Sequence, residues 1–168
     1  MERFESLLRS DEGRQRLALD ALRIYLGIGL VVRGALFISK PNLVTELLAS
    51  HGFFWPMVVA HYVAIAHLAG GLMLALGFMT RLAALAQLPA LLGAVLFVHL
   101  RDGLFTQGQG LELSALVFVM LAAVAVVGAG PLSIDARMAA RDAEHEQERL
   151  DEDERAKHSG PAQPVRVH

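Results

Sequence analysis

Long apolar runs separated by short polar breaks dominate the hydrophobic pattern of this chain. A helix needs roughly 20 apolar residues to cross the hydrocarbon core of a bilayer. Four segments come close to that length, and each is predicted to be a membrane-spanning helix. They run from about Ala18 to Ile38, Pro56 to Met79, Leu82 to Leu100 and Leu111 to Val127.

The polar breaks predict how the four spans are connected. Only Thr80 and Arg81 separate the second span from the third, so these two should form an antiparallel hairpin. The break after the first span contains a short amphipathic pattern, which predicts a helix along the membrane surface with Asn42 as its N-cap. The apolar positions of this helix are Leu43, Val44, Leu47 and Leu48.

The pattern predicts an all-α integral membrane protein built around a four-helix bundle. We expect a cytoplasmic lead over 1–17, the four-span bundle over 18–130, a charged cytoplasmic helix over 131–157 and a disordered tail over 158–168. Ser133 is the expected N-cap of the charged helix. The distribution of basic residues near the span ends predicts that both termini lie in the cytoplasm. These basic residues are Arg3, Arg9, Arg14, Arg16, Arg81, Arg137 and Arg141, against Lys40 and Arg101 in the outer loops.

Composition supports the membrane assignment and narrows the chemistry. Hydrophobic residues make up 54% of the 168 positions, and the formal net charge of −2 comes from two polar ends around an almost uncharged middle. There is no cysteine, so disulfides, thiolate metal sites and iron–sulfur ligation by this chain are excluded. We expect lipid as a partner, no nucleic acid and no bound metal.

Ionisable residues within the spans are the candidate functional groups. With the predicted topology, His67, His99, Glu112 and Arg33 converge in the outer half of the bundle from four separate spans. Charged and titratable groups at membrane depth are costly and usually face the bundle interior or a wet cavity. We therefore expect His67, His99 and Glu112 to be catalytic and Arg33 to contribute to ligand binding.

Small residues on the second span predict that a neighbouring helix approaches it closely. The spacings between them along the chain alternate between four and three residues, which places them on one helix face. His67 lies on the same face, so its side chain should point into the bundle. His61 is displaced from His67 by about 120° around the helix. The two histidines therefore cannot bind one metal ion in the manner of a zinc-binding helix, whose ligands are four residues apart. His61 and Gly71 are further ligand-binding candidates. The whole face comprises Ala60, Ala64, His67, Gly71 and Ala75.

Plainer interpretations of these polar residues stay open. His61 could be a packed histidine that donates to a carbonyl, and Glu112 could form a structural ion pair with Arg33. A haem held between His67 and His99 is conceivable, although the chain has no attachment motif. Gln87 and Pro89 are most simply a polar contact and a kink.

The sequence resembles the DoxX family of small four-helix bacterial membrane proteins. The matching stretches are LRIYLGIGLVVRGALFISKP, HLAGGLMLALGFMTRLAALAQ, His99 and LELSALVFVMLAAVAVVGAGPLSID, which includes Ser133 and Asp135. The family is similar to a membrane subunit of a thiosulfate:quinone oxidoreductase. The resemblance therefore implies quinone-linked or redox-associated work. Many relatives carry an acidic residue just before the Gly-Gly pair, where this chain has His67.

Three functions are compatible with these observations. The first is a membrane subunit that binds a quinone or similar lipophilic molecule, with His67 and His99 as carbonyl partners, Glu112 as proton relay and Arg33 as electrostatic tuner. The second is a non-catalytic scaffold that anchors a soluble oxidoreductase through the charged C-terminal helix. The third is a small proton-linked permease. Transporters are commonly built from repeated units, and because this sequence shows no internal repeat, a homo-oligomer would have to supply the second unit.

Overall fold

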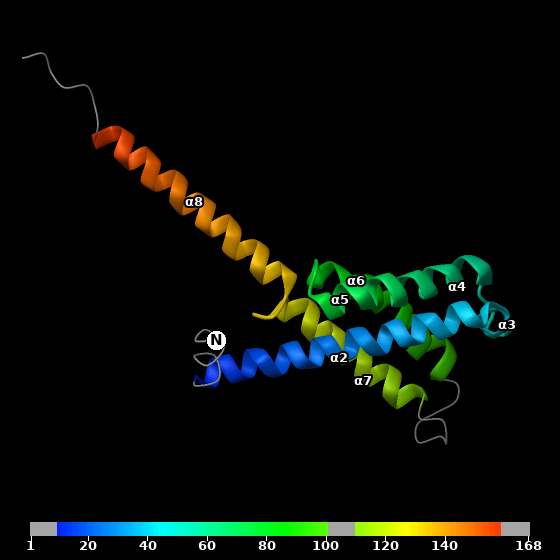
Figure 1. Cartoon of the computed structure of the whole chain (residues 1–168). Coiled ribbons are helices and arrows are strands. Elements are labelled where there is room, and N and C mark those ends of the chain that lie inside the picture. The colour runs from blue at the N-terminus through cyan, green and yellow to red at the C-terminus, as the bar shows by residue number, and fades with distance from the viewer. Residues whose placement is uncertain (1–9, 101–109, 159–168) are drawn as a thin grey trace, which may run out of the picture.

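The computed structural model describes residues 10–100 and 110–158, and these residues form helices and turns without strands (Figure 1). The predicted lead up to residue 9, the outer-loop Arg101 and the tail from 159 lie outside the described residues. The α-helices are α2 Asp11–Ser39, α3 Pro41–Ser50, α4 Pro56–Ile65, α5 Gly71–Leu76, α6 Thr80–Gly93, α7 Gly110–Val127 and α8 Ile134–His158. Two π-helical segments, η1 Ala66–Gly70 and η2 Ala94–His99, continue α4 and α6.

Four helical stretches are long and apolar enough to cross a membrane, as the hydrophobic pattern predicts. The first helix begins at Asp11, seven residues before the predicted start at Ala18. Its N-terminus is stabilised because the Ser10 side chain accepts from the amide of Gly13 at 3.1 Å. The stretches are Asp11–Ser39, Pro56–Leu76, Thr80–Val98 and Gly110–Val127, so the second combines α4, η1 and α5 and the third combines α6 and η2.

The turn between the second and third spans comes earlier than predicted. Helix α5 ends at Gly77, whose φ of 69° is in the left-handed region that favours glycine. The amide of Gly77 donates to Leu74 and that of Phe78 to Met73, the pattern of a Schellman motif. Thr80 and Arg81 therefore lie in the first turn of α6, and the prediction that they form the break was wrong.

Glycines bring α2 into backbone contact with the second span. A Cβ on Gly27 would lie 2.7 Å from the carbonyl oxygen of Gly71, and one on Gly71 would lie 2.9 Å from the amide nitrogen of Val31. A Cβ on Gly34 would lie 2.7 Å from the amide of Leu68 in η1. The small-residue face therefore packs closely against its neighbour, as predicted.

The short helix after the first span is present as α3. Val44 and Leu48 are buried and pack against Ala60 of α4. The helix begins at Pro41, whose missing amide donor costs nothing in a first turn. Asn42 therefore lies inside the helix, and its predicted role as the N-cap was wrong.

The bundle carries large apolar side chains on its outside. Ile28, Val32, Ile65, Leu85 and Val119 are each more than half exposed. Several of the fully buried side chains are polar, including Gln87 and Thr80. This distribution suits a protein whose surroundings are hydrocarbon rather than water.

Helix α8 extends away from the bundle (Figure 1). Ser133 caps it, because the Ser133 hydroxyl accepts from the amide of Ala136 at 3.0 Å, as the sequence predicts. From Arg141 to Leu150 every side chain is exposed. The helix covers 134–158, close to the predicted 131–157.

Candidate functional site

Polar groups gather at both ends of the bundle. One end, which we name the α3 end, contains the C-terminus of α2, helix α3 and the N-terminus of α7. The other, the α8 end, contains the N-terminus of α2, the α5–α6 turn and the loop before α8. The α3 end holds a cavity of about 290 Å³, here named the α3-end cavity. Its lining residues include Arg33, Phe37, Val44, His67, Val98 and Ser114.

His67 is the buried titratable group on the wall of this cavity. Its side chain is 3% exposed, and its Nδ1 lies 2.8 Å from the carbonyl oxygen of Val63. A carbonyl oxygen can only accept, so Nδ1 carries the proton of this hydrogen bond. In the neutral ring, Nε2 is then the acceptor. A neutral His67 can therefore accept a hydrogen bond from a ligand hydroxyl.

Phe37 links His67 to the cationic group of the cavity. The rings of Phe37 and His67 meet edge to face, with centroids 5.4 Å apart. The guanidinium carbon of Arg33 lies 5.5 Å from the centroid of the same Phe37 ring. Arg33 has only donors, so the cavity wall offers N–H groups from one side chain and an acceptor from the other.

The two π-helical segments both border the α3-end cavity. His67 of η1 lines this cavity, and so do Ala94 and Val98 of η2. Single π turns inside α-helices often occur at functional sites. The amide of Gln87 in α6 donates to the carbonyl of Ala66 at 2.6 Å and so anchors the start of η1. Gln87 therefore positions the segment that presents His67.

The other predicted site residues lie at different places. His61 is exposed, bonds the carbonyl of Met57 through Nδ1 at 2.7 Å and lines a separate, smaller cavity. Gly71 packs against the backbone of α2 and does not line the α3-end cavity. Glu112 is half-buried in the first turn of α7, two residues before the cavity-lining Ser114. The backbone of His99 ends η2, and its side chain lies outside the described part of the chain.

An ion pair at the α8 end was missed by the sequence analysis. Asp20 and Arg23 of α2 are each 1% exposed, and the Nη2 of Arg23 lies 2.8 Å from Oδ1 of Asp20. Arg23 also donates from Nη1 to the carbonyls of Leu74 at 2.5 Å and Ala75 at 3.1 Å. The second carboxylate oxygen of Asp20 accepts from the amide of Leu132 at 2.8 Å. The pair thus joins α2 to the end of α5 and to the loop before α8.

Asp135 makes a second connection at this end. Its carboxylate accepts from the amides of Met79 and Thr80, at 2.7 and 2.9 Å, and from the Thr80 hydroxyl at 2.9 Å. Burial opposes ionisation, but these hydrogen bonds and the charge of Arg23 outweigh it and hold the pKa of Asp135 below its usual value. Asp135 therefore caps the N-terminus of α6 from another segment.

Four long apolar helices, an apolar exterior and several polar side chains buried among the helices define a multi-pass helical membrane protein. The family model of DoxX matches residues 18–100, which is consistent with a DoxX family membrane protein, as the resemblance in its sequence indicated. The matched range covers the first three spans and stops before α7 and the glycine-rich loop. No curated protein and no solved structure matches the chain.

Proposed function

We propose that this protein binds a quinone or a similar lipophilic ring in the α3-end cavity, as a membrane subunit of a redox system. The observation that carries the proposal is the buried His67, whose neutral ring presents an acceptor on a cavity wall that also holds Arg33. The remaining lining is mostly apolar and includes Phe37 and Phe53. Ligand sites typically combine such an apolar lining with a few polar groups.

The hydrogen-bonding pattern favours a ligand with a hydroxyl group. His67 was expected to donate to a quinone carbonyl, but its Nδ1 proton is already given to Val63. A quinol hydroxyl would instead donate to Nε2, and Arg33 would donate to an oxygen of the same molecule. His67 could then accept one of the two hydroxyl protons when the ring is oxidised, and the other would leave to water at the α3 end. The two electrons would pass to a partner oxidoreductase, because the chain has no cysteine to carry them.

Binding of a short-chain ubiquinol to the purified protein tests the proposal. We expect His67→Phe to weaken binding by about tenfold, since one ligand hydrogen bond contributes about 1.4 kcal/mol. Phenylalanine keeps the ring contact with Phe37, so a loss of affinity reports the lost acceptor rather than lost volume. The matched control is His61→Phe, on the same span but outside the cavity. Equal affinity in all three proteins, or no binding at all, would remove the proposal.

A second candidate is a scaffold that holds a soluble oxidoreductase through α8. The observation that favours it is a 25-residue helix whose side chains from 141 to 150 are all exposed. A helix that is polar all round commonly bridges between domains or partners. The test is copurification of an oxidoreductase from native membranes with the full chain and with a chain ending at Arg141. A scaffold loses its partner on truncation while the bundle keeps its melting temperature.

We also propose that the α8 end faces the cytoplasm, with the protein in a bacterial inner membrane. Arg14, Arg16 and Arg81 lie at this end, and Arg137 and Arg141 follow in α8. The absence of native cysteine allows single-cysteine labelling in whole cells. Glu148→Cys should resist a membrane-impermeant maleimide, while Thr45→Cys in α3 should react. The reverse labelling pattern would invert the orientation.

A further inference from the structure

A second cavity, larger than the α3-end cavity, lies between α2 and α7 at the α8 end of the bundle. Its volume is about 550 Å³, within the range of roughly 300–1,000 Å³ that ligand sites occupy. We name it the α2–α7 cavity. It shares no lining residue with the α3-end cavity, so an inference about it is independent of the proposed function.

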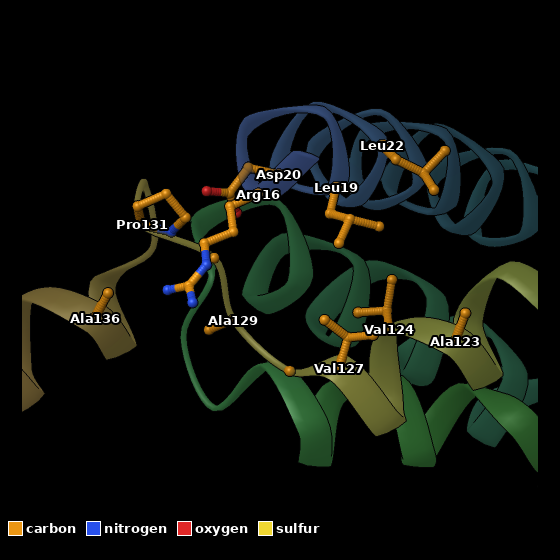
Figure 2. A pocket seen from close by; sticks show the side chains of 12 residues that line it. Arg16, Leu19, Asp20, Leu22, Ala123, Val124, Val127, Ala129, Pro131 and Ala136 are labelled. Atoms are coloured by element: carbon orange, nitrogen blue, oxygen red, sulfur yellow. The ribbon is translucent and has the colours of Figure 1, made fainter. Parts of the chain in front are cut away.

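The long walls of the α2–α7 cavity are apolar. Figure 2 shows Leu19 and Leu22 of α2 facing Val124 and Val127 of α7 across the space. Leu19 is 39% exposed and Val127 is 55% exposed, so the walls continue onto the surface that faces hydrocarbon. The second span takes most of the packing surface of α2, which leaves this side of the helix open along α7.

The cationic side chain that lines this cavity is Arg16, which is itself exposed. It extends from α2 toward the loop after α7, which carries Ala129 and Pro131 (Figure 2). The nearby carboxylate of Asp20 is already neutralised by Arg23 and bonded to the amide of Leu132. A Cβ on Gly128 would lie 2.9 Å from Nε of Arg81, which places that second cation beside the negative C-terminus of α7.

The charge that remains after these pairings is that of Arg16. We infer that the α2–α7 cavity binds one anionic phospholipid, with its phosphate on Arg16 and its acyl chains along the apolar walls. Arg16 lies near the start of the first span, at the depth where a headgroup phosphate meets a helix end. Arginine donors recognise phosphate oxygens well, and basic pockets between membrane helices bind anionic headgroups. A phospholipid without net charge would gain the same apolar contact but less from the guanidinium.

The test is the thermal stability of the purified full chain in detergent micelles with added phosphatidylglycerol or phosphatidylcholine. A lipid that binds only the folded protein should raise the melting temperature, here by about 5 °C at saturating phosphatidylglycerol, and phosphatidylcholine should have a smaller effect. In Arg16→Gln the two lipids should act alike. Arg14→Gln is the matched control, since Arg14 is two positions away on the same helix and pairs with Asp11 at an exposed site.

Two further measurements separate a lipid site from a site for a free anion. Ala123→Phe places a ring in the cavity and should reduce the phosphatidylglycerol effect even though Arg16 remains. Inorganic phosphate should give no stabilisation, because it lacks the acyl chains that would pack against the apolar walls. Equal stabilisation by both lipids in the unchanged protein, an unchanged preference in Arg16→Gln, or full stabilisation by inorganic phosphate would overturn the inference.

Discussion

The two ends of the bundle hold their polar groups in different ways, since the Asp20–Arg23 pair is buried whereas Arg33 is exposed. At the α8 end, Asp20 and Arg23 bond each other and the backbone of two other segments. At the α3 end, Arg33 of α2 and His67 of η1 line a cavity, and the Nδ1 of His67 bonds a carbonyl of its own span. The first arrangement uses its polar groups to connect helices. The second presents them to a space that a ligand can fill.

A costly residue inside a membrane bundle therefore does not by itself identify a binding site. Breaking a buried pair is expensive because it leaves an uncompensated charge. Donors and acceptors that line a cavity can instead engage a ligand, which makes their removal a matter of affinity rather than stability. Substitutions at the two ends of the bundle should separate these two roles.

The largest effect is expected at the buried ion pair. Arg23→Leu leaves Asp20 buried without its cation and two carbonyls without their donor, so it should destabilise the bundle by about 3–5 kcal/mol. The measurement is reversible unfolding in mixed micelles. The control is Arg14→Leu, which removes an exposed pair with the same spacing and should cost at most about 0.5 kcal/mol. Similar losses of unfolding free energy in Arg23→Leu and Arg14→Leu would mean that burial does not determine the cost of breaking the ion pair.

The next effect concerns close helix packing. Gly27→Ala places a methyl group against the backbone of Gly71 and Ala75 and should cost about 1–3 kcal/mol. Gly93→Ala, in a helix bordering the α3-end cavity, meets nothing within 4 Å and should be neutral or stabilising by up to about 1 kcal/mol. Both variants can be compared by melting temperature in one detergent. A harmless Gly27→Ala would contradict the tight packing of α2 on the second span.

A smaller effect is expected at the cap made by Asp135. Its pKa is lowered in the folded protein, so its stabilisation is complete above the ordinary value near 3.8 and is lost as pH falls through the lower folded value. Asp135→Asn should cost about 1 kcal/mol at neutral pH and remove this part of the acid sensitivity. Melting temperature between pH 7 and 3 measures both. If Asp135→Asn keeps the full acid sensitivity, the loss of stability at low pH comes from titratable groups other than Asp135.

The smallest effect on stability is expected at Arg33. Arg33→Leu and Arg23→Leu both replace an arginine of α2 with leucine. The contact that Arg33→Leu removes is the one between the guanidinium and the Phe37 ring. The cost should be about 1 kcal/mol or less. The same unfolding measurement applies, with Arg23→Leu as the reference. A loss as large as that of Arg23→Leu would mean that Arg33 also stabilises the bundle and would end the contrast between the two ends.

Hydrophobic periodicity was enough to predict the four spans, the α3 helix and the burial of His67. These features depend on residues close in sequence, where a run length or a spacing of three and four carries the information. The Ser133 cap was predictable for the same reason, because its acceptor and donor are three residues apart. Turn position was harder, since Gly77 ends α5 before the polar Thr80 and Arg81 are reached.

The Asp20–Arg23 pair was missed because its partners are distant in sequence. Arg23 bonds a carbonyl 51 residues away, and Asp20 bonds an amide 112 residues away. One local signal was present: an acid and a base three positions apart within a predicted span can neutralise each other on one helix face. The π-helical segments had no comparable signal. The contact that anchors η1 comes from Gln87 on another span.

The firm attachment of α8 has a consequence for distance. Ser133 and Asp135 fix its first turn, and 25 residues at 1.5 Å each give a rod about 37 Å long. The length of this helix therefore sets an upper limit on the distance between the lipid surface and a protein docked near Leu150. Shortening α8 by whole turns would draw such a partner inward in steps of about 5.4 Å without changing either docking surface.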